Sequence, residues 1–212
     1  MENNLKKTVV LDYYGIPGSG KSTTSHALAE KYREEGKSVI EPSYNYDHHG
    51  SGITRKLRKL AVTILFGVRS PRRFVSVYRL GKLNGYTLSS GLFNQMVNII
   101  TKIYAIEQYN EHYDYIIFDE GLVQAAISLS INSERFCGEN LTDLYTLVSE
   151  LEHFNPMIVV LDIEEALRRI EIRNSKDTRV EALDSPEHRY KLMEKYNNLV
   201  YDIYDFFHEN GI

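Results

Sequence analysis

The chain alternates between short apolar runs bounded by turn residues and longer segments in which apolar residues recur every three or four positions. The short runs are typical of β-strands and the longer segments of amphipathic helices. We expect strands at 8–14, 37–41, 114–119 and 157–162, and helices at 21–35, 53–82, 92–112, 139–153, 163–173 and 185–208. Strands that alternate with helices predict an α/β fold, in which a parallel sheet of four or five strands is flanked by helices on both faces.

Two of the expected strands differ from the others in composition. Residues 114–119 (DYIIFD) and 157–162 (MIVVLD) are continuous apolar runs that end in a carboxylate. Such runs are typical of strands that are buried on both faces of a sheet. The helical segment 53–82 has a different feature, because we expect it to be broken at Gly67, Pro71 and Gly81.

Residues 15–22 (GIPGSGKS) match the pattern GxxxxGK[ST] and directly follow the first strand. In this pattern, main-chain N–H groups surround the phosphates of a nucleoside triphosphate, and the helix that begins next adds the positive end of its dipole. We expect Lys21 to reach the β- and γ-phosphates and Ser22 to coordinate Mg²⁺. The residues expected to line this ATP site are Gly15, Pro17, Gly18, Ser19, Gly20, Lys21, Ser22 and Thr23.

The composition is that of a folded protein. Of 212 residues, 42% are hydrophobic and 25% are charged, which excludes a disordered chain. The longest apolar run, 60–68, is less than half of the roughly 20 residues that span a bilayer. The N-terminus does not resemble a secretion signal, and a single cysteine excludes an internal disulfide. These features predict a cytoplasmic protein without a transmembrane segment.

Charge is distributed unevenly along the chain. Residues 48–106 contain ten basic and no acidic residues, whereas the rest of the chain contains 15 basic and 29 acidic residues. One interpretation is a basic surface that faces solvent. The other is an anionic partner, because neighbouring cations without counter-charges repel one another. Phosphate is the obvious candidate for that anion.

The strand at 157–162 is not followed by the NKxD motif with which GTPases read guanine. The phosphate loop, the number of strands and the helices between the second and third strands resemble the P-loop nucleoside and nucleotide kinases, in particular the thymidylate kinase and deoxynucleoside kinase group. The resemblance extends over most of the chain. It implies a three-layer P-loop NTPase fold with 1–212 as a single kinase domain, ATP and Mg²⁺ as cofactors, and a nucleoside or nucleoside monophosphate as phosphoryl acceptor.

The resemblance also implies two residues that contact the acceptor, Glu41 and Gln95. Glu41-Pro42 resembles the EP element of this group, whose glutamate acts as a base on the acceptor or hydrogen-bonds its 5′ end. A carboxylate at the end of a strand beside the phosphate loop is placed to accept the proton of an attacking hydroxyl. Gln95 resembles the base-reading glutamine of the deoxynucleoside kinases, with an ordinary packing role as the alternative. Tyr44 follows Glu41 closely and is expected to line the acceptor pocket.

The third strand ends with Asp119 and Glu120. Asp119 suits the role of holding Mg²⁺ and its water ligands together with Ser22. The related kinases usually carry an arginine after the acidic residue, and Glu120 stands in its place. This departure removes one cation from the acceptor site. It makes Glu120 a candidate second carboxylate, for the metal or for the acceptor hydroxyl.

Arg169, Arg173 and Arg179 follow the fourth strand and resemble the short arginine lid of thymidylate kinases, which we place at 173–181. Guanidinium groups in such a lid stabilise the charge of the transferring phosphoryl group. A solvated helix with surface ion pairs is the alternative interpretation. The candidate catalytic residues are therefore Lys21, Glu41, Asp119, Glu120, Arg169, Arg173 and Arg179.

Residues 42–91 hold nine of the ten basic residues of the 48–106 stretch, and we expect them to form a cap over the acceptor in which Arg72 and Arg73 contact an anionic group. Two alternatives remain open. One is a kinase of a sugar, an antibiotic or another small metabolite. The other is an ATP-binding module that contacts nucleic acid or a membrane, although the net charge of −4 argues against a stable nucleic-acid partner. A homodimer is compatible with each of these functions.

Overall fold

The computed structural model describes residues 7–43, 52–83, 90–131, 138–173 and 179–212. Within these ranges the chain forms a four-stranded sheet in the order β2-β3-β1-β4, and every neighbouring pair is parallel. The strands are β1 (Val9–Tyr14), β2 (Val39–Ile40), β3 (Tyr115–Phe118) and β4 (Phe154–Ile158). This confirms the α/β fold with a parallel sheet that the sequence predicts.

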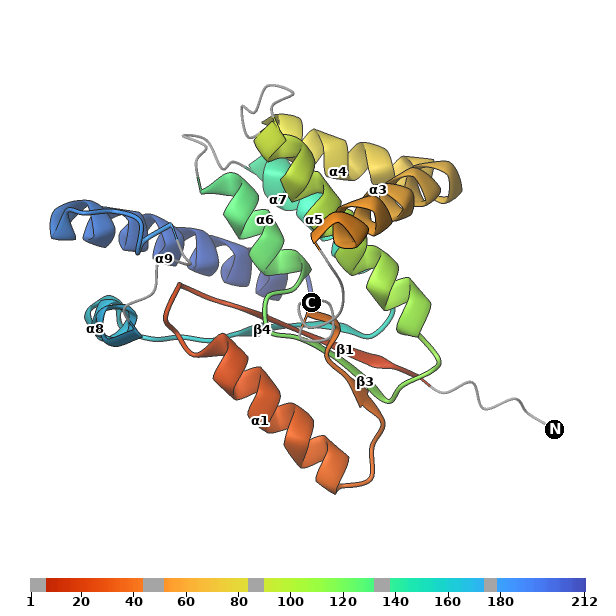
Figure 1. Cartoon of the computed structure of the whole chain (residues 1–212), viewed down its shortest axis with the longest axis horizontal. Coiled ribbons are helices and arrows are strands. Elements are labelled where there is room, and N and C mark those ends of the chain that lie inside the picture. The colour runs from red at the N-terminus through yellow and green to blue at the C-terminus, as the bar shows by residue number, and fades with distance from the viewer. Residues whose placement is uncertain (1–6, 44–51, 84–89, 132–137, 174–178) are drawn as a thin grey trace.

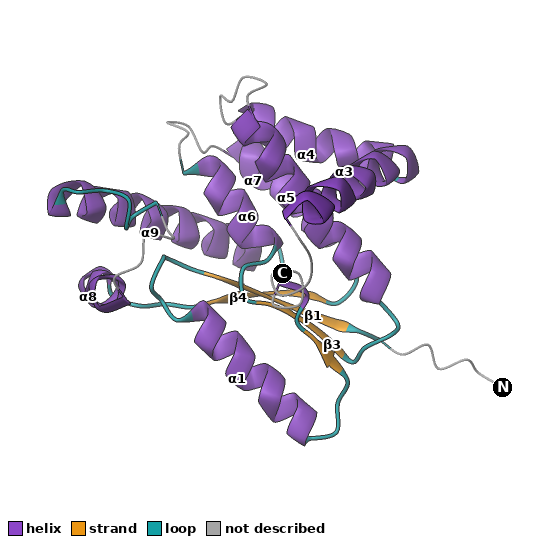
Figure 2. Ribbon diagram, in the orientation of Figure 1, coloured by secondary structure: helices purple, strands orange, loops and turns teal. Residues whose placement is uncertain are grey.

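Helices cover both faces of this sheet (Figures 1 and 2). One helix, α1, lies on one face, and α5, α6 and α9 lie on the other. The pair α3 and α4 packs outside α5, with α7 against α4. The bounds are α1 (Lys21–Glu34), α3 (Gly52–Arg69), α4 (Pro71–Leu83), α5 (Ser90–Tyr109), α6 (Leu122–Ser130), α7 (Gly138–Ser149), α8 (Ile163–Arg173) and α9 (Pro186–Glu209).

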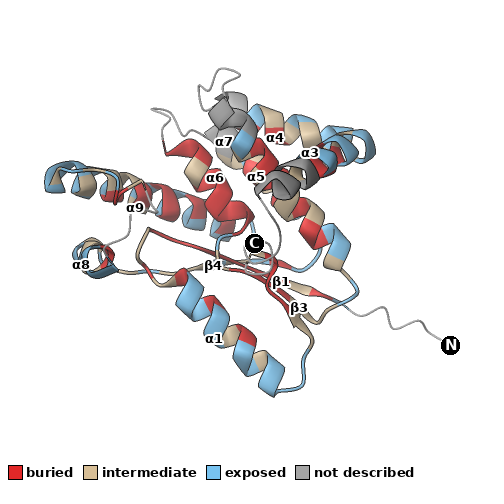
Figure 3. Ribbon diagram, viewed as in Figure 1, coloured by how far each residue is buried: buried red, intermediate tan, exposed pale blue. Residues whose placement is uncertain are grey.

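The residues of β1 alternate between the two faces of the sheet, as the pleat of a strand requires. Leu11 and Tyr13 join the smaller apolar cluster beneath α1. Val10 and Tyr14 join the larger cluster, which continues into α5, α6 and α9. Buried residues accordingly run along the strands and the inward sides of these helices in Figure 3. Asp12 stands in the same alternation as Val10 and Tyr14, so it faces the larger cluster.

The prediction of a buried strand at 157–162 was wrong. The strand β4 occupies Phe154–Ile158. It is an edge strand of the described sheet, with β1 as its neighbour. Its residues alternate in exposure, and Met157 is 37% exposed. A proline has no N–H to donate to the sheet, and this costs least on a strand with a single neighbour. Pro156 is therefore tolerated in β4.

The break in the basic helical segment occurs at one of the three expected residues. Helices α3 and α4 are separated at Ser70, and Pro71 begins α4, where a missing N–H costs nothing. Gly67 and Gly81 lie inside helices, so the breaks expected there were wrong.

Helix α6 has no counterpart among the elements that the sequence pattern predicts. Its sequence LVQAAISLS is mostly apolar, and almost all of its residues are buried, the polar Gln124 and Ser130 among them. A helix without a polar face lacks the periodicity from which helices are predicted.

None of the described helices combines the length and the apolar character that crossing a membrane requires.

Candidate active site

The loop between β1 and α1 depends on glycine. Gly18 and Gly20 have φ angles of 80° and 94°, in the left-handed region that glycine adopts without strain. At Gly18 a Cβ atom would also lie 2.7 Å from the carbonyl oxygen of Ala166. Gly20 is the N-cap of α1, and the first turn of this helix has no acidic residue. The positive end of the α1 dipole therefore faces the loop without a carboxylate from that turn to neutralise it.

Two polar groups show how this loop is held and what it could bind. The N–H of Gly15 donates a hydrogen bond of 3.0 Å to Oε1 of Gln124 on α6. The Ser19 hydroxyl is buried and has no hydrogen-bond partner among the described residues. A buried hydroxyl without a partner loses free energy on folding. Its position in the loop is consistent with a bound ligand oxygen at this point.

Lys21 lies over the same loop. Its Nζ donates to the carbonyl oxygens of Gly15 at 3.1 Å and Ile16 at 3.0 Å. Burial lowers the pKa of Lys21, and the carboxylates of Glu120 and Asp119 oppose this shift. The lysine thus brings a partly desolvated cation to the place where the main chain and the helix dipole already favour an anion.

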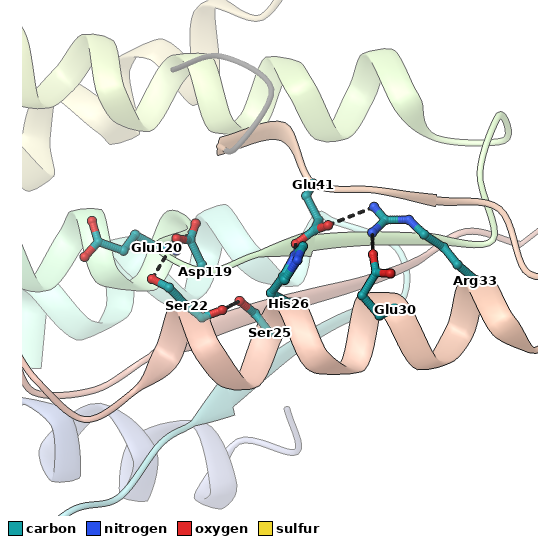
Figure 4. Close-up of polar contacts among 8 residues, drawn as sticks. All are labelled: Ser22, Ser25, His26, Glu30, Arg33, Glu41, Asp119 and Glu120. Atoms are coloured by element: carbon teal, nitrogen blue, oxygen red, sulfur yellow. Dashed lines mark hydrogen bonds and ion pairs between the residues drawn. The ribbon is translucent and has the colours of Figure 1, made fainter. Parts of the chain in front are cut away.

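Ser22 and Asp119 meet at the start of α1. The Ser22 hydroxyl donates to Oδ2 of Asp119 at 3.0 Å, and Asp119 directly follows β3 (Figure 4). A hydroxyl and a carboxylate are oxygen ligands of the kind that Mg²⁺ prefers. The two residues therefore fit the magnesium-holding role expected for them.

A cavity of about 750 Å³ extends from the phosphate loop to α5. Its loop end is lined by residues 17, 18 and 20–23 and by the arginines near α8, and its α5 end by residues of α3 and α5. This volume lies within the roughly 300–1,000 Å³ that small-molecule sites occupy. Asp119 and Glu120 line the cavity between the two ends.

All three predicted lid arginines line the loop end. Arg169 Nε donates to Glu165 Oε1 at 2.8 Å. Arg173 Nη2 donates at 2.7 Å to Oε1 of Glu181, which is buried. Arg179 Nη1 donates to the carbonyl oxygen of Ser128 on α6 at 3.0 Å. Residues 174–178 of the predicted lid lie outside the described residues.

The α5 end carries amides, a hydroxyl and two ammonium groups. Gln95, the predicted base-reading residue, lines it together with Asn98 and Thr101. Lys59 of α3 donates from Nζ to Asn98 Oδ1 at 3.1 Å. Lys102 of α5 donates from Nζ to the carbonyl oxygen of Glu120. Lys102 therefore brings a cation to the position where the sequence has Glu120 in place of an arginine.

Asp12 lies beneath this end of the cavity, and sequence reasoning did not single it out. Its Oδ2 accepts hydrogen bonds from the N–H groups of Leu122 at 2.6 Å and Val123 at 3.2 Å, so it caps α6. A Cβ at Gly121 would lie 2.0 Å from Oδ1 of Asp12, and this close approach requires glycine. Burial raises the pKa of Asp12 to about 7, and Lys102 opposes the shift. The sequence did contain a signal that could have identified Asp12, because it is a carboxylate within the otherwise apolar and aromatic strand β1.

Further site residues that sequence reasoning missed are Gln124, Asn98, Lys59 and Lys102. Gln124 is one of three polar residues of the largely apolar α6, with Ser128 and Ser130, and its side chain is buried. The two lysines belong to the basic stretch without acidic residues, but sequence alone did not separate them from the exposed cations of that stretch.

Glu41 does not line the large cavity. Its carboxylate accepts from Arg33 Nη2 at 2.8 Å and lies 3.1 Å from His26 Nδ1, so both oxygens are engaged with α1 (Figure 4). It faces a smaller cavity that it shares with Ser22 and Asp119. This geometry gives no support to Glu41 as the acceptor base. Tyr44, the neighbouring prediction, lies outside the described residues.

Arg72 and Arg73 belong to α4 and do not line either cavity. Arg73 forms ion pairs with Glu107 of α5 and with Glu150, at 2.6 Å in the second case. Arg72 is exposed. The predicted contact of these arginines with substrate therefore has no geometric basis, because Arg73 joins α4 to its neighbours and Arg72 faces solvent.

No protein-family model matches the chain, and no curated protein sequence matches it. Among solved structures, the chain is similar to a deoxyadenosine kinase from M. mycoides with bound dATP, with 18% identity and a TM-score of 0.47 over 93% of this chain and 84% of the other. It is also similar to a structure of that enzyme with dCMP and a flexible dCDP, with 18% identity and a TM-score of 0.45 over 95% and 85% of the two chains.

Proposed function

We propose that this protein is a kinase that transfers the γ-phosphoryl group of ATP to a small acceptor bound at the α5 end of the cavity. The observation that supports this most strongly is the continuity of one cavity between the phosphate loop and the polar residues of α5. A phosphate-binding loop alone would fit many functions. A second polar compartment beside it is what a transfer reaction between two substrates requires.

At the loop end, residues 15–22 bind the phosphates of ATP. The main-chain N–H groups and Lys21 neutralise the β- and γ-phosphates, and the glycines let the backbone approach them. Arg169, Arg173 and Arg179 stabilise the charge that spreads over the oxygens of the transferring group. Glu165 and Glu181 hold two of these guanidinium groups in position through the hydrogen bonds described above.

Ser22 and Asp119 are the residues that would hold Mg²⁺. When bound, the metal neutralises charge on the β- and γ-phosphate oxygens. The hydrogen bond between Ser22 and Asp119 keeps these two oxygen ligands at the same place.

At the α5 end, the acceptor places its nucleophilic oxygen beside Asp119 and Glu120. Gln95 and Asn98 present amide groups that can hydrogen-bond the edge of a nucleobase. The amides of Gln95 and Asn98 favour a nucleoside or nucleoside monophosphate over a small sugar, because a planar amide can form paired hydrogen bonds with the planar edge of a nucleobase.

The test is an assay of phosphoryl transfer from ATP with Mg²⁺ to nucleosides, nucleoside monophosphates and sugars. Transfer to a nucleoside or nucleoside monophosphate is expected, and Asp119→Asn should lower kcat at least about 100-fold. The control is Asp202→Asn, an exposed change on α9 that should leave the rate unchanged. ATP hydrolysis without transfer to any acceptor would contradict the proposal.

A further inference from the structure

Two lysines at the α5 end of the cavity have no role in the binding of ATP described above. Lys59 comes from α3 and Lys102 from α5, and both line the cavity. Each ammonium donates to a neutral oxygen: Lys59 to the side chain of Asn98 at 3.1 Å, and Lys102 to the main chain of Glu120. Among the described residues, neither has a carboxylate within ion-pair distance of 4.0 Å.

These ammonium groups repel one another, and Lys102 is desolvated. Burial lowers the pKa of Lys102, and Lys59 lowers it further, whereas Asp12, Glu120 and Asp119 act in the opposite direction. Of these carboxylates, Asp12 is itself buried and caps α6. Asp119 is bonded to Ser22, where Mg²⁺ would compete for its charge. The positive charge at this end is therefore incompletely balanced by the protein.

We propose that Lys59 and Lys102 form an anion-binding subsite, and that the acceptor is a nucleoside monophosphate. This inference rests on the proposed kinase function and narrows its substrate class. An uncharged nucleoside would leave two neighbouring cations without a counter-charge. A phosphate group would neutralise them and accept hydrogen bonds from both, which offsets their repulsion and the desolvation cost of Lys102.

The chemistry of the transfer agrees with this class of acceptor. A non-bridging oxygen of the acceptor phosphate donates an electron pair to the γ-phosphorus of ATP, and a P–O bond forms. The bond from the γ-phosphorus to the β,γ-bridging oxygen breaks, and its electron pair leaves with ADP. The product is a nucleoside diphosphate. Above its second pKa of about 6 the acceptor phosphate is a dianion, so no proton must be removed.

The position of Glu41 is consistent with such a reaction. A hydroxyl acceptor needs a base within hydrogen-bond reach. Glu41 has both oxygens engaged by Arg33 and His26 and lies outside the large cavity. With a phosphate dianion as nucleophile, transfer does not depend on this carboxylate.

The test compares kcat/KM for each nucleoside with kcat/KM for its 5′-monophosphate, in the wild-type protein and over all common bases. We expect the monophosphate to be preferred at least about 100-fold. Lys59→Met and Lys102→Met should each raise the KM of the monophosphate about 10-fold or more and leave the KM of ATP within about twofold. Arg69→Met is the matched control, since Arg69 is an exposed cation at the end of α3, outside the cavity.

Each outcome of this experiment is decisive. Equal or better use of nucleosides would overturn the inference and leave the kinase function intact. Absence of transfer to any acceptor would overturn the kinase function, and calorimetry with the monophosphate alone would then test the subsite. Binding that is weakened by both lysine substitutions would support the subsite, and no binding by the wild-type protein would refute it. The wild-type comparison does not depend on whether Lys102→Met folds.

Discussion

The two ends of the cavity are built in different ways. At the loop end, one continuous segment supplies main-chain N–H groups, a helix terminus, Lys21 and Ser22. At the α5 end, the polar groups are side chains from α3, α5 and the end of β3, which are far apart in the sequence. A site made by the backbone of one segment can be recognised from a short motif. A site made by side chains from several elements becomes visible only once those elements are packed.

Two arginines of the loop end, Arg169 and Arg173, are balanced differently from the two lysines of the α5 end. Arg169 and Arg173 are each hydrogen-bonded to a glutamate, and the Glu181 partner of Arg173 is buried. Lys59 and Lys102 are bonded to neutral oxygens. The arginines are therefore held in position by the protein, whereas the charge of the lysines is to be balanced by substrate.

The largest expected effect concerns Asp12, beneath the α5 end. Its pKa rises from 3.8 in the unfolded chain to about 7 in the folded protein. Between these values the folded state holds a proton that the unfolded state has released. The free energy of unfolding should therefore fall as the pH rises from about 4 to about 7, by roughly 4 kcal/mol from this group.

Asp12→Asn isolates this effect. Asparagine cannot titrate, and its carbonyl can accept the bonds from Leu122 and Val123. The variant should therefore gain stability relative to the wild-type protein as the pH rises from 4 to 8. Denaturant unfolding at several pH values measures the difference. If the free energy of unfolding changed with pH in the same way for the two proteins, the pKa of Asp12 would not be raised in the folded state.

The next effect tests the loop end. Arg169 lines the cavity, whereas Arg168 is its neighbour on α8, lies outside the cavity and bonds the same Glu165. Arg169→Met should lower kcat about 100-fold, or about 2.7 kcal/mol, because it removes charge stabilisation from the transition state. Arg168→Met is the matched control and should change kcat less than twofold. Equal losses in the two variants would assign Arg169 a structural role.

The smallest effect concerns a cation outside the cavity. Arg73 is bonded to Glu107 and Glu150 and is partly exposed. Arg73→Ala should lower the free energy of unfolding by about 1 kcal/mol and leave the KM of both substrates unchanged. Thermal unfolding and steady-state kinetics measure the two quantities. An increase in the KM of the acceptor alone would instead indicate that Arg73 contacts the acceptor.

The sequence predicted the parallel sheet, the phosphate loop and the positions of α1 and α8 closely, because each has a local pattern. It missed α6, whose residues are buried on almost all sides, and placed the fourth strand too late, because β4 is exposed on alternate residues. For the site, Lys21, Ser22, Asp119 and the lid arginines lie together as expected.

What the sequence could not predict depends on packing between distant segments. The basic stretch contains both Lys59, which enters the cavity, and Arg73, which joins α4 to its neighbours. Their chemistry is similar, and only the helix face on which each one stands separates them. The orientation of Glu41 could not be predicted for the same reason, because it depends on Arg33 and His26 of α1.

The binding of ATP by the loop is the central claim, and titration calorimetry of the protein with ATP and Mg²⁺ tests it most directly. We expect one site with a Kd in the micromolar range, at least about 10-fold weaker binding by Lys21→Met, and unchanged binding by Lys31→Met, an exposed lysine on the same helix. A wild-type protein that releases no heat on titration, or a Lys21→Met variant that binds as tightly as the wild type, would contradict the account.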